Sequence, residues 1–202
     1  MRDRCRCGQG DIPSPLRIIG GTDAAYTGQK GIGVVALYTF PGLEPVEYAV
    51  AVRHLLFPYV PGLFAFRELP ICLAACEKLT TGFDLLMVNG HGYAHPQRFG
   101  MACHAGALLG VPTIGIASRP LSGRSGQPGR ARGSCSPLMD RGEVVGMAVR
   151  TREGSRPVYV SAGYDTDLSF AVEITLAAAR DRTMPLPLHG ADRLAREYRR
   201  MM

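Results

Sequence analysis

Apolar residues in the first quarter of the chain fall into three runs, which are broken by Gly and Pro turns. The runs cover residues 17–26, 31–40 and 46–54 and are rich in β-branched and aromatic side chains, which favour strands. The connections between them are short, whereas a parallel crossover needs about a dozen residues or more. The pattern therefore predicts an antiparallel meander of three strands.

Beyond residue 70 the hydrophobic pattern alternates between helix and strand. We expect helices at 71–79, 99–109, 167–180 and 190–202, and strands at 83–88, 112–117, 143–150 and 157–161. Residues 118–137 are rich in Gly, Ser, Pro and Arg, which predicts a long loop that is functional or disordered. The order of elements predicts an α/β fold, in which helices flank a mixed sheet whose first three strands are antiparallel.

Length and composition are those of an ordinary globular protein, with 202 residues, 46% hydrophobic and 20% charged. Residues 1–15 are polar and rich in Pro and Gly, so we expect a disordered lead-in before a single domain over residues 16–202. No uncharged apolar stretch reaches about 18 residues, and the N-terminus lacks the hydrophobic segment of a signal peptide. We therefore expect a cytoplasmic monomer without a membrane span.

The formal net charge of +6 favours a polyanionic partner such as nucleic acid, although a solvated surface rich in Arg would give the same excess. The candidate phosphate contacts are Arg98 and the arginines of the 118–137 loop, namely Arg119, Arg124, Arg130 and Arg132.

Three polar residues stand at positions where α/β enzymes place chemistry. Asp23 interrupts the first apolar run, where it costs stability unless it is hydrogen-bonded or meets a cation. Glu68 lies near a helix start, and Asn89 ends the apolar run 85–88 at a glycine-rich turn. Each residue alone has a simple structural explanation. Together they indicate a divalent-cation site with one member neutralised, because hard oxygen ligands suit Mg²⁺.

This order, with an acid on the first strand, a second on the following helix and a third polar residue on the fourth strand, is the layout of ribonuclease-H-like nucleases. A metal ion in such a site activates water and stabilises the leaving oxygen in phosphodiester hydrolysis. His91 and His95 lie four apart in the turn after Asn89, but no third soft ligand accompanies them, so zinc is the weaker interpretation.

Five stretches give the chain a specific family resemblance. They are GGTDAAY, PYVPGLFAFRELP, VNGHGYAHPQRFGMACHAGALLGVPTIGIA, GEVVGMAVRTREGSRPVYVSAGYDTDLSFAVEI and MPLPLHGADRLAREYRR. In that order, from about residue 17 to 200, they resemble endonuclease V. The resemblance implies a ribonuclease-H-like fold and a nucleic-acid repair activity that depends on Mg²⁺, with Mn²⁺ as an alternative. The family cuts DNA or RNA at the second phosphodiester on the 3′ side of inosine, a deaminated adenine.

The resemblance also assigns roles to individual residues. Asp23 and Glu68 match the first two metal-site carboxylates, and Tyr59 matches an aromatic wedge that fills the gap beside the lesion. The pocket for the flipped base takes in Pro61, Gly62, Leu63, Gly90, His91, Gly92 and His95. Flipping a base costs a few kcal/mol, least for a poorly paired base, and stacking on an aromatic ring returns about 1–3 kcal/mol.

Three positions depart from the family pattern. Asn89 stands where the family has Asp, Ser118 where it has Lys, and Tyr164 where it has a catalytic His. The amide of Asn89 can still bind a metal ion through oxygen, and Ser118 or Arg119 would meet the phosphate. Tyr164 cannot replace an imidazole near neutral pH. Two functions therefore stay open, a working nuclease and a catalytically impaired paralogue that binds inosine or distorted nucleic acid without cutting.

A carboxylate elsewhere could replace the one missing at position 89. Asp165 and Asp167 are candidates, although they precede a helix and have a simple explanation as caps. The N-terminal helix that usually precedes the first strand in this family is also missing from the pattern.

Overall fold

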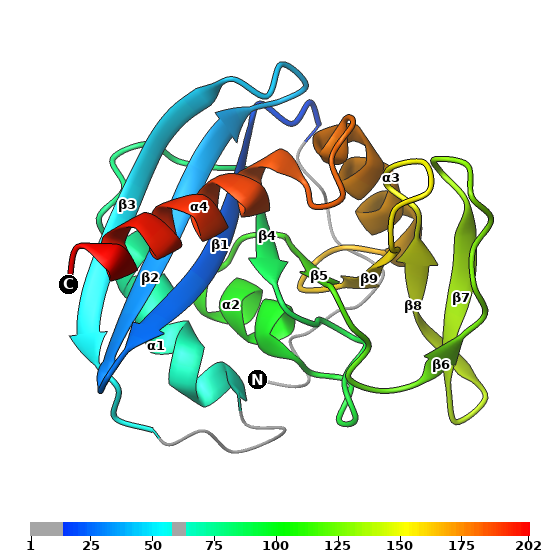
Figure 1. The fold of residues 1–202 in the computed structure, drawn as a ribbon, viewed down its shortest axis with the longest axis horizontal. Helices are drawn as coiled ribbons and strands as arrows, with labels where there is room; N and C mark the ends of the chain where they lie inside the picture. Colours follow the sequence, from blue (N-terminus) through cyan, green and yellow to red (C-terminus); the bar gives the residue numbers. More distant parts are fainter. Residues whose placement is uncertain (1–13, 58–63) are drawn as a thin grey trace.

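A nine-stranded mixed sheet runs through the protein, which the computed structural model describes over residues 14–57 and 64–202. The strands are β1 (Ile18–Thr27), β2 (Lys30–Thr39), β3 (Pro45–His54), β4 (Leu85–Asn89), β5 (Thr113–Ala117), β6 (Arg124–Ser125), β7 (Cys135–Asp140), β8 (Glu143–Val149) and β9 (Val158–Ala162). The helices are α1 (Phe64–Cys76), α2 (Met101–Leu109), α3 (Leu168–Ala179) and α4 (Leu186–Arg200). The strand order across the sheet is β3-β2-β1-β4-β5-β9-β8-β7-β6 (Figure 1).

The sheet is antiparallel at both sides and parallel in its centre. β1, β2 and β3 form the antiparallel meander that the sequence predicts, and β1 then pairs in parallel with β4, and β4 with β5. The antiparallel pairs β5–β9, β9–β8, β8–β7 and β7–β6 complete the sheet. The parallel centre brings the carboxyl ends of β4 and β5 to one edge, which is where such sheets carry their sites.

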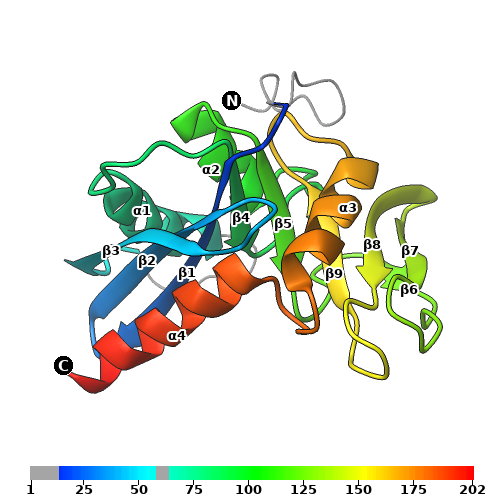
Figure 2. The same cartoon turned by 90° about the horizontal axis from the view of Figure 1, so that it is seen from above.

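Helices cover both faces, with α1 and α2 on one side and α3 and α4 on the other (Figure 2). Successive side chains of a strand point to opposite faces of the sheet, so those of the central strand β4 contact both helical layers. Leu86 and Val88 pack with α1 and α2, whereas Leu85 and Met87 pack with α3 and α4. This explains why residues 85–88 form a continuous apolar run.

Two glycines allow helices to approach the sheet backbone directly. A Cβ at Gly33 of β2 would overlap the carbonyl oxygen of Ile71 in α1, and a Cβ at Gly21 of β1 would overlap the backbone of Pro187 in α4. Only glycine permits contacts this close. The positions of α1 and α4 are therefore set by backbone contacts on opposite faces of neighbouring strands.

Most predicted elements occur close to their expected positions, with three differences. α1 begins at Phe64 rather than at 71 and contains Pro70, although proline usually ends a helix. The predicted loop 118–137 instead contains β6 and the start of β7, which is paired with β8. α4 begins at Leu186, because Pro187 fits the first turn of a helix.

The lead-in predicted for residues 1–15 lies almost entirely outside the described residues. No helix in the described part of the chain is long and apolar enough to cross a membrane.

Candidate active site

Asp23, Glu68 and Asn89 meet at one cavity. The parallel pairing of β1 with β4 sets Thr22 opposite Val88, so the next residues, Asp23 and Asn89, lie side by side. The amide nitrogen Nδ2 of Asn89 donates a hydrogen bond of 2.9 Å to Oδ1 of Asp23. Glu68 comes from α1, and all three residues line a cavity of about 670 Å³.

Burial perturbs both carboxyl groups of this cavity. It raises the pKa of Asp23 to about 6, against the hydrogen bonds from Asn89 and the Ala24 backbone, and it raises the pKa of Glu68 to about 8. The hydroxyl of Tyr26 donates to Oε1 of Glu68. Within residues 14–57 and 64–202, neither carboxylate forms an ion pair with Arg, Lys or His. Two such groups side by side are destabilised as anions unless a cation binds between them.

The donor set fits a hard divalent cation. Mg²⁺ is usually held by one or two carboxylates and keeps several waters or substrate oxygens, and Asp23 and Glu68 supply the two carboxylates. The described residues contain no group of three or more His, Cys, Asp or Glu side chains that could hold a metal ion. Among those residues, His91 and His95 belong to no such group.

Asp192 is a third carboxylate at the cavity, which was not among the residues expected there. It comes from α4 and lines the same cavity as Asp23, and its negative charge contributes to raising the pKa of Asp23. Its Oδ1 accepts a hydrogen bond of 2.8 Å from Nε of Arg196. In sequence this is an ordinary i,i+4 pair on a basic helix, and only the packing of α4 against β1 brings it to the site.

The turn after β4 forms one wall of the cavity. Gly90, His91 and His95 line it. Gly92 lies behind, where a Cβ would overlap the carbonyl oxygen of Ala162, so only glycine fits. Burial lowers the pKa of His91 to about 4, which keeps its imidazole neutral at physiological pH. Its Nε2 lies 3.0 Å from the carbonyl oxygen of Arg119.

Ser118 and Arg119 follow β5 and also line the cavity, whereas Tyr164 does not. The backbone of Tyr164 is hydrogen-bonded to Thr113, at the opposite end of β5 from Ser118. The structure thus does not bring Tyr164 to the cavity that Asp23, Glu68 and Asn89 line, and its expected place in the catalytic group stays a prediction.

The two aspartates after Tyr164 do not replace the carboxylate missing at position 89. Asp167 caps α3, since its Oδ1 accepts a hydrogen bond of 2.8 Å from the backbone nitrogen of Phe170. Asp165 adopts a positive φ of 49° in the turn before it. Neither residue lines the cavity.

Aromatic rings form the other wall of the cavity. Phe66, Phe99 and His104 all line it. The rings of Phe66 and His104 meet edge to face at 5.7 Å, and those of Phe99 and His104 lie 4.3 Å apart. The Phe66 side chain is 53% exposed. The cavity therefore combines an acidic wall with a surface on which a planar ring can stack.

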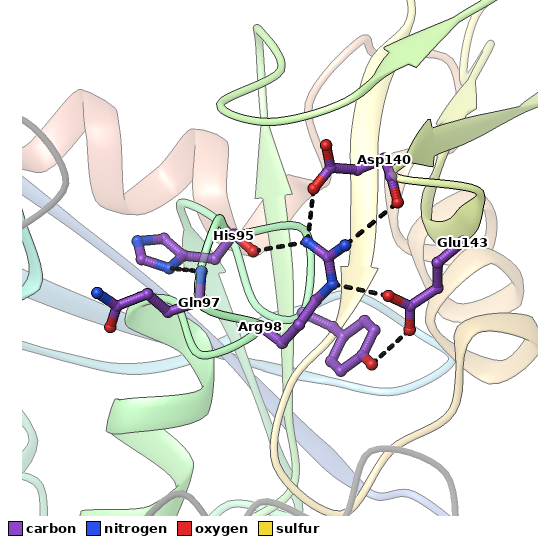
Figure 3. Close-up of polar contacts among 6 residues, drawn as sticks. His95, Gln97, Arg98, Asp140 and Glu143 are labelled. Atoms are coloured by element: carbon purple, nitrogen blue, oxygen red, sulfur yellow. Dashed lines mark hydrogen bonds and ion pairs between the residues drawn. The ribbon is translucent and has the colours of Figure 1, made fainter.

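The expected wedge, Tyr59, and three expected residues of the base pocket, Pro61, Gly62 and Leu63, lie outside the described residues. Arg98 does not match the expectation of a phosphate contact, because its guanidinium is bound to two acidic side chains, Asp140 and Glu143 (Figure 3).

Comparison with known proteins identifies close relatives. A sequence model of the family Endonuclease V matches residues 5–193. The endonuclease V of Myxococcus xanthus is 49% identical over 185 residues, which cover 91% of this chain and 79% of that protein. The crystal structure of endonuclease V from Streptomyces avermitilis has a TM-score of 0.94 and 38% identity, over 99% of this chain and 89% of that one.

A more distant structure shares the fold and contains nucleic acid. Endonuclease V of Ciona intestinalis, solved with a 24-mer DNA that contains an inosine followed by a ribo-adenosine, has a TM-score of 0.83 and 22% identity. The match covers 99% of this chain and 93% of that one.

Proposed function

The chain belongs to the endonuclease V family of metal-dependent nucleases, and from that premise we propose that it hydrolyses nucleic-acid strands beside inosine, at the second phosphodiester on the 3′ side. The observation that carries this proposal is the half-buried carboxyl group of Asp23 and the buried one of Glu68, both with raised pKa values, in a cavity that aromatic rings also line. The carboxyl groups suit a metal ion and a phosphate, and the aromatic rings suit a flipped base.

In this proposal Asp23 and Glu68 hold Mg²⁺, or Mn²⁺ in its place. When bound, the metal ion acts as a Lewis acid at the phosphate and stabilises the charge that develops on the leaving oxygen. Asn89 holds Asp23 through its 2.9 Å hydrogen bond and lacks the charge that the family carries at this position. The Tyr26 hydroxyl holds Glu68 from the other side.

We further propose that Asp192 supplies part of the negative charge that Asn89 lacks. Its carboxylate lines the cavity and acts electrostatically on Asp23. Arg196 fixes one of its oxygens, which leaves the carboxylate oriented to position water or a polar group of the substrate.

The base would enter the part of the cavity lined by Phe66, Phe99 and His104, with Gly90 and His95 at its polar rim. Inosine pairs weakly, so extracting it costs less than extracting a normal base. Ser118 and Arg119 would meet the phosphate, and either DNA or RNA fits this arrangement. A cytoplasmic location, a monomeric state and a single domain over residues 16–202 belong to the same proposal.

The test is cleavage of inosine oligonucleotides, single- and double-stranded, in Mg²⁺ and in Mn²⁺, with adenine oligonucleotides of the same sequence as control substrates. Asp23→Asn and Glu68→Gln should abolish cleavage. Glu173→Gln, a carboxylate-to-amide change on the exposed side of α3, should have no effect.

Gel shifts run in parallel separate binding from cutting. Cleavage at the second bond 3′ to inosine by the natural chain supports the proposal. Binding of inosine strands with cleavage only after Asn89→Asp would reduce the function to recognition. The absence of both inosine binding and cleavage in the natural chain and in Asn89→Asp would refute it.

A further inference from the structure

Arg98 sits at the centre of a polar cluster that the proposed reaction does not use. Its Nη1 donates to the carbonyl oxygen of His95 at 3.0 Å and to Oδ2 of Asp140 at 2.7 Å. Its Nη2 reaches the carbonyl oxygen of Asp140 at 3.2 Å, and its Nε reaches Oε2 of Glu143 at 2.8 Å. One planar guanidinium therefore joins a backbone carbonyl to two carboxylates, which only Arg can do.

The Arg98–Asp140 part of the cluster is sheltered from solvent, whereas the Glu143 side chain is 45% exposed and contacts a tyrosine. The side chains of Arg98 and Asp140 are 16% and 19% exposed, so their ion pair is screened less than a surface pair. The hydroxyl of Tyr93 donates to Oε1 of Glu143 at 2.5 Å, and the guanidinium lies 5.8 Å from the Tyr93 ring centroid.

The two carboxylates flank the tip of the β7–β8 hairpin. Asp140 and Glu143 are paired across a two-residue turn whose central residues, Arg141 and Gly142, both have positive φ. Such turns give a hairpin a defined twist. The cluster thus connects the turn after β4, at the centre of the sheet, to a hairpin several strands away.

The backbone of Arg98 is itself unusual, with a positive φ of 56°. This region is unfavourable for residues other than glycine, so surrounding interactions must hold it in place. The short segment from His95 to Arg98 is closed by two further contacts, from the Arg98 backbone nitrogen to the His95 carbonyl at 2.8 Å and from the Gln97 backbone nitrogen to His95 Nδ1 at 3.2 Å.

The segment faces two ways. Figure 3 shows the His95 ring and the Gln97 side chain on one side and the Arg98 guanidinium with Asp140 and Glu143 on the other. His95 and Gln97 line the cavity, and Arg98 does not. The Gln97 backbone nitrogen donates to Nδ1 of His95, so Nδ1 is the acceptor. In the neutral ring the proton therefore lies on Nε2, which can donate a hydrogen bond.

We propose that Arg98 is a positioning residue, which uses the β7–β8 hairpin as a fixed support to place His95 and Gln97 against the substrate. The inference rests on the proposed function, since it assigns His95 and Gln97 to the recognition of the nucleotide in that cavity. It predicts that loss of the cluster weakens substrate recognition and leaves the metal-holding carboxylates intact.

The first test is kinetic, on the full chain. Arg98→Gln should raise KM for the inosine strand by about 10- to 100-fold, the usual range when a residue that supports a ligand-binding group is removed, and change kcat by less than about threefold. Arg98→Lys should have a KM between those of the natural chain and Arg98→Gln, because an ammonium keeps the charge but cannot bridge all four acceptor oxygens. Glu143→Gln provides a second route to the same loss if Arg98→Gln folds poorly.

The matched control is Arg141→Gln. It removes an Arg from the same hairpin at a residue that also has a positive φ but is exposed and does not line the cavity. It should leave KM unchanged. A fall in kcat at constant KM in Arg98→Gln, or equal effects in Arg98→Gln and Arg141→Gln, would overturn the inference.

The second test needs no substrate and separates this inference from the proposed function. The imidazole proton resonances of His95, assigned by comparison with His95→Gln, should shift in Arg98→Gln and Glu143→Gln and stay in place in Arg141→Gln. Unmoved His95 resonances would refute the positioning role even if the chain cleaves inosine strands. Shifted resonances in a chain that neither binds nor cuts inosine would uphold the positioning of His95 by Arg98 and refute the proposed function.

Discussion

At the scale of single residues, the affinity of the site for a cation depends on how many carboxylates line the cavity. Asp23 and Glu68 have raised pKa values because they are buried, and Asn89 contributes a hydrogen bond where a carboxylate would have contributed a third charge. A site of this type binds a cation less strongly than one with three carboxylates, since each added anion strengthens the attraction. Asp192 is the other acidic residue that lines the cavity, and we propose that it replaces part of the charge missing at Asn89.

Asp192→Asn should lower cleavage of inosine strands by about 10- to 100-fold, the usual cost of removing a group that orients ligands of a metal site. The comparison is Asp181→Asn, the same change at an exposed residue between α3 and α4 that does not line the cavity. Cleavage rates in saturating Mg²⁺ measure the effect. Equal rates for both variants would mean that Asp192 serves only to pair with Arg196.

At the scale of elements, the helices that carry the acidic residues are held by direct backbone contact with the sheet. Glu68 lies one turn before Ile71, whose carbonyl oxygen rests on Gly33. The contact leaves no room for a methyl group, so any change at Gly33 must move the helix rather than a neighbouring side chain.

Gly33→Ala should therefore destabilise the protein by about 1–3 kcal/mol, as overpacking in a tight interior does, and should reduce cleavage because Glu68 moves with α1. The control is Gly82→Ala, where a Cβ meets nothing within 4 Å. Urea unfolding and cleavage assays measure the two effects. Wild-type stability in Gly33→Ala would show that α1 can shift at no cost.

A carboxylate also connects β3 to the segment between α1 and β4. Oε1 of Glu47 accepts hydrogen bonds from the backbone nitrogen and the hydroxyl of Thr80, and Oε2 accepts from the nitrogen of Thr81. These bonds favour the charged form and lower the pKa of Glu47 to about 2. The stabilisation is thus complete above about pH 4.5, the ordinary pKa, and is lost as the pH falls toward 2.

Glu47→Gln should remove this part of the acid sensitivity. The variant should be less stable than the natural chain near pH 6 and approach it near pH 2.5, because protonation weakens the natural carboxylate as an acceptor of these bonds. Thermal unfolding from pH 2.5 to 6 measures the difference. A constant difference over this range would contradict the pKa shift.

Some elements follow from local sequence and others depend on distant contacts. Residues 85–88 predict a buried strand because their apolar run reflects two covered faces. β7 was not predicted, because Pro137 and its mostly exposed residues break the hydrophobic pattern of a strand. Its backbone hydrogen bonds with β8 stabilise it instead. Arginines predicted to contact phosphate proved partly structural, since Arg132 donates to the carbonyl oxygens of Leu176 and Arg180 at the end of α3.

The site itself divides in the same way. The grouping of Asp23, Glu68 and Asn89 could be inferred, because each occupies a strand or helix position with a recognisable pattern. Asp192 could not, because its place at the cavity depends on how α4 packs against β1. Tyr164, which the resemblance grouped with those three residues, lies outside that cavity. A chain offers no local signal for contacts made across the thickness of a sheet.

At the scale of the whole molecule, the net charge of +6 sets how the protein meets a polyanion. Binding of inosine strands should weaken steeply as salt rises, because each neutralised phosphate releases a counterion. Arg119→Gln should reduce the slope of log K against log salt by about one, whereas Arg152→Gln, at an exposed residue away from the cavity, should leave it unchanged. Fluorescence anisotropy between low and physiological KCl measures both slopes.

The glycine contacts of β1 and β2 have a consequence for how such a protein can change over evolutionary time. Gly21 and Gly33 contact the backbones of α4 and α1 on opposite faces of the sheet. The distance between Asp192 and Glu68 therefore depends on these backbone contacts more than on which side chains fill the core. One aliphatic core residue can therefore replace another during evolution without moving α1 or α4, and the geometry of the site is kept. Loss of either glycine is a different kind of event, because it alters the geometry in a single step that later core substitutions cannot reverse.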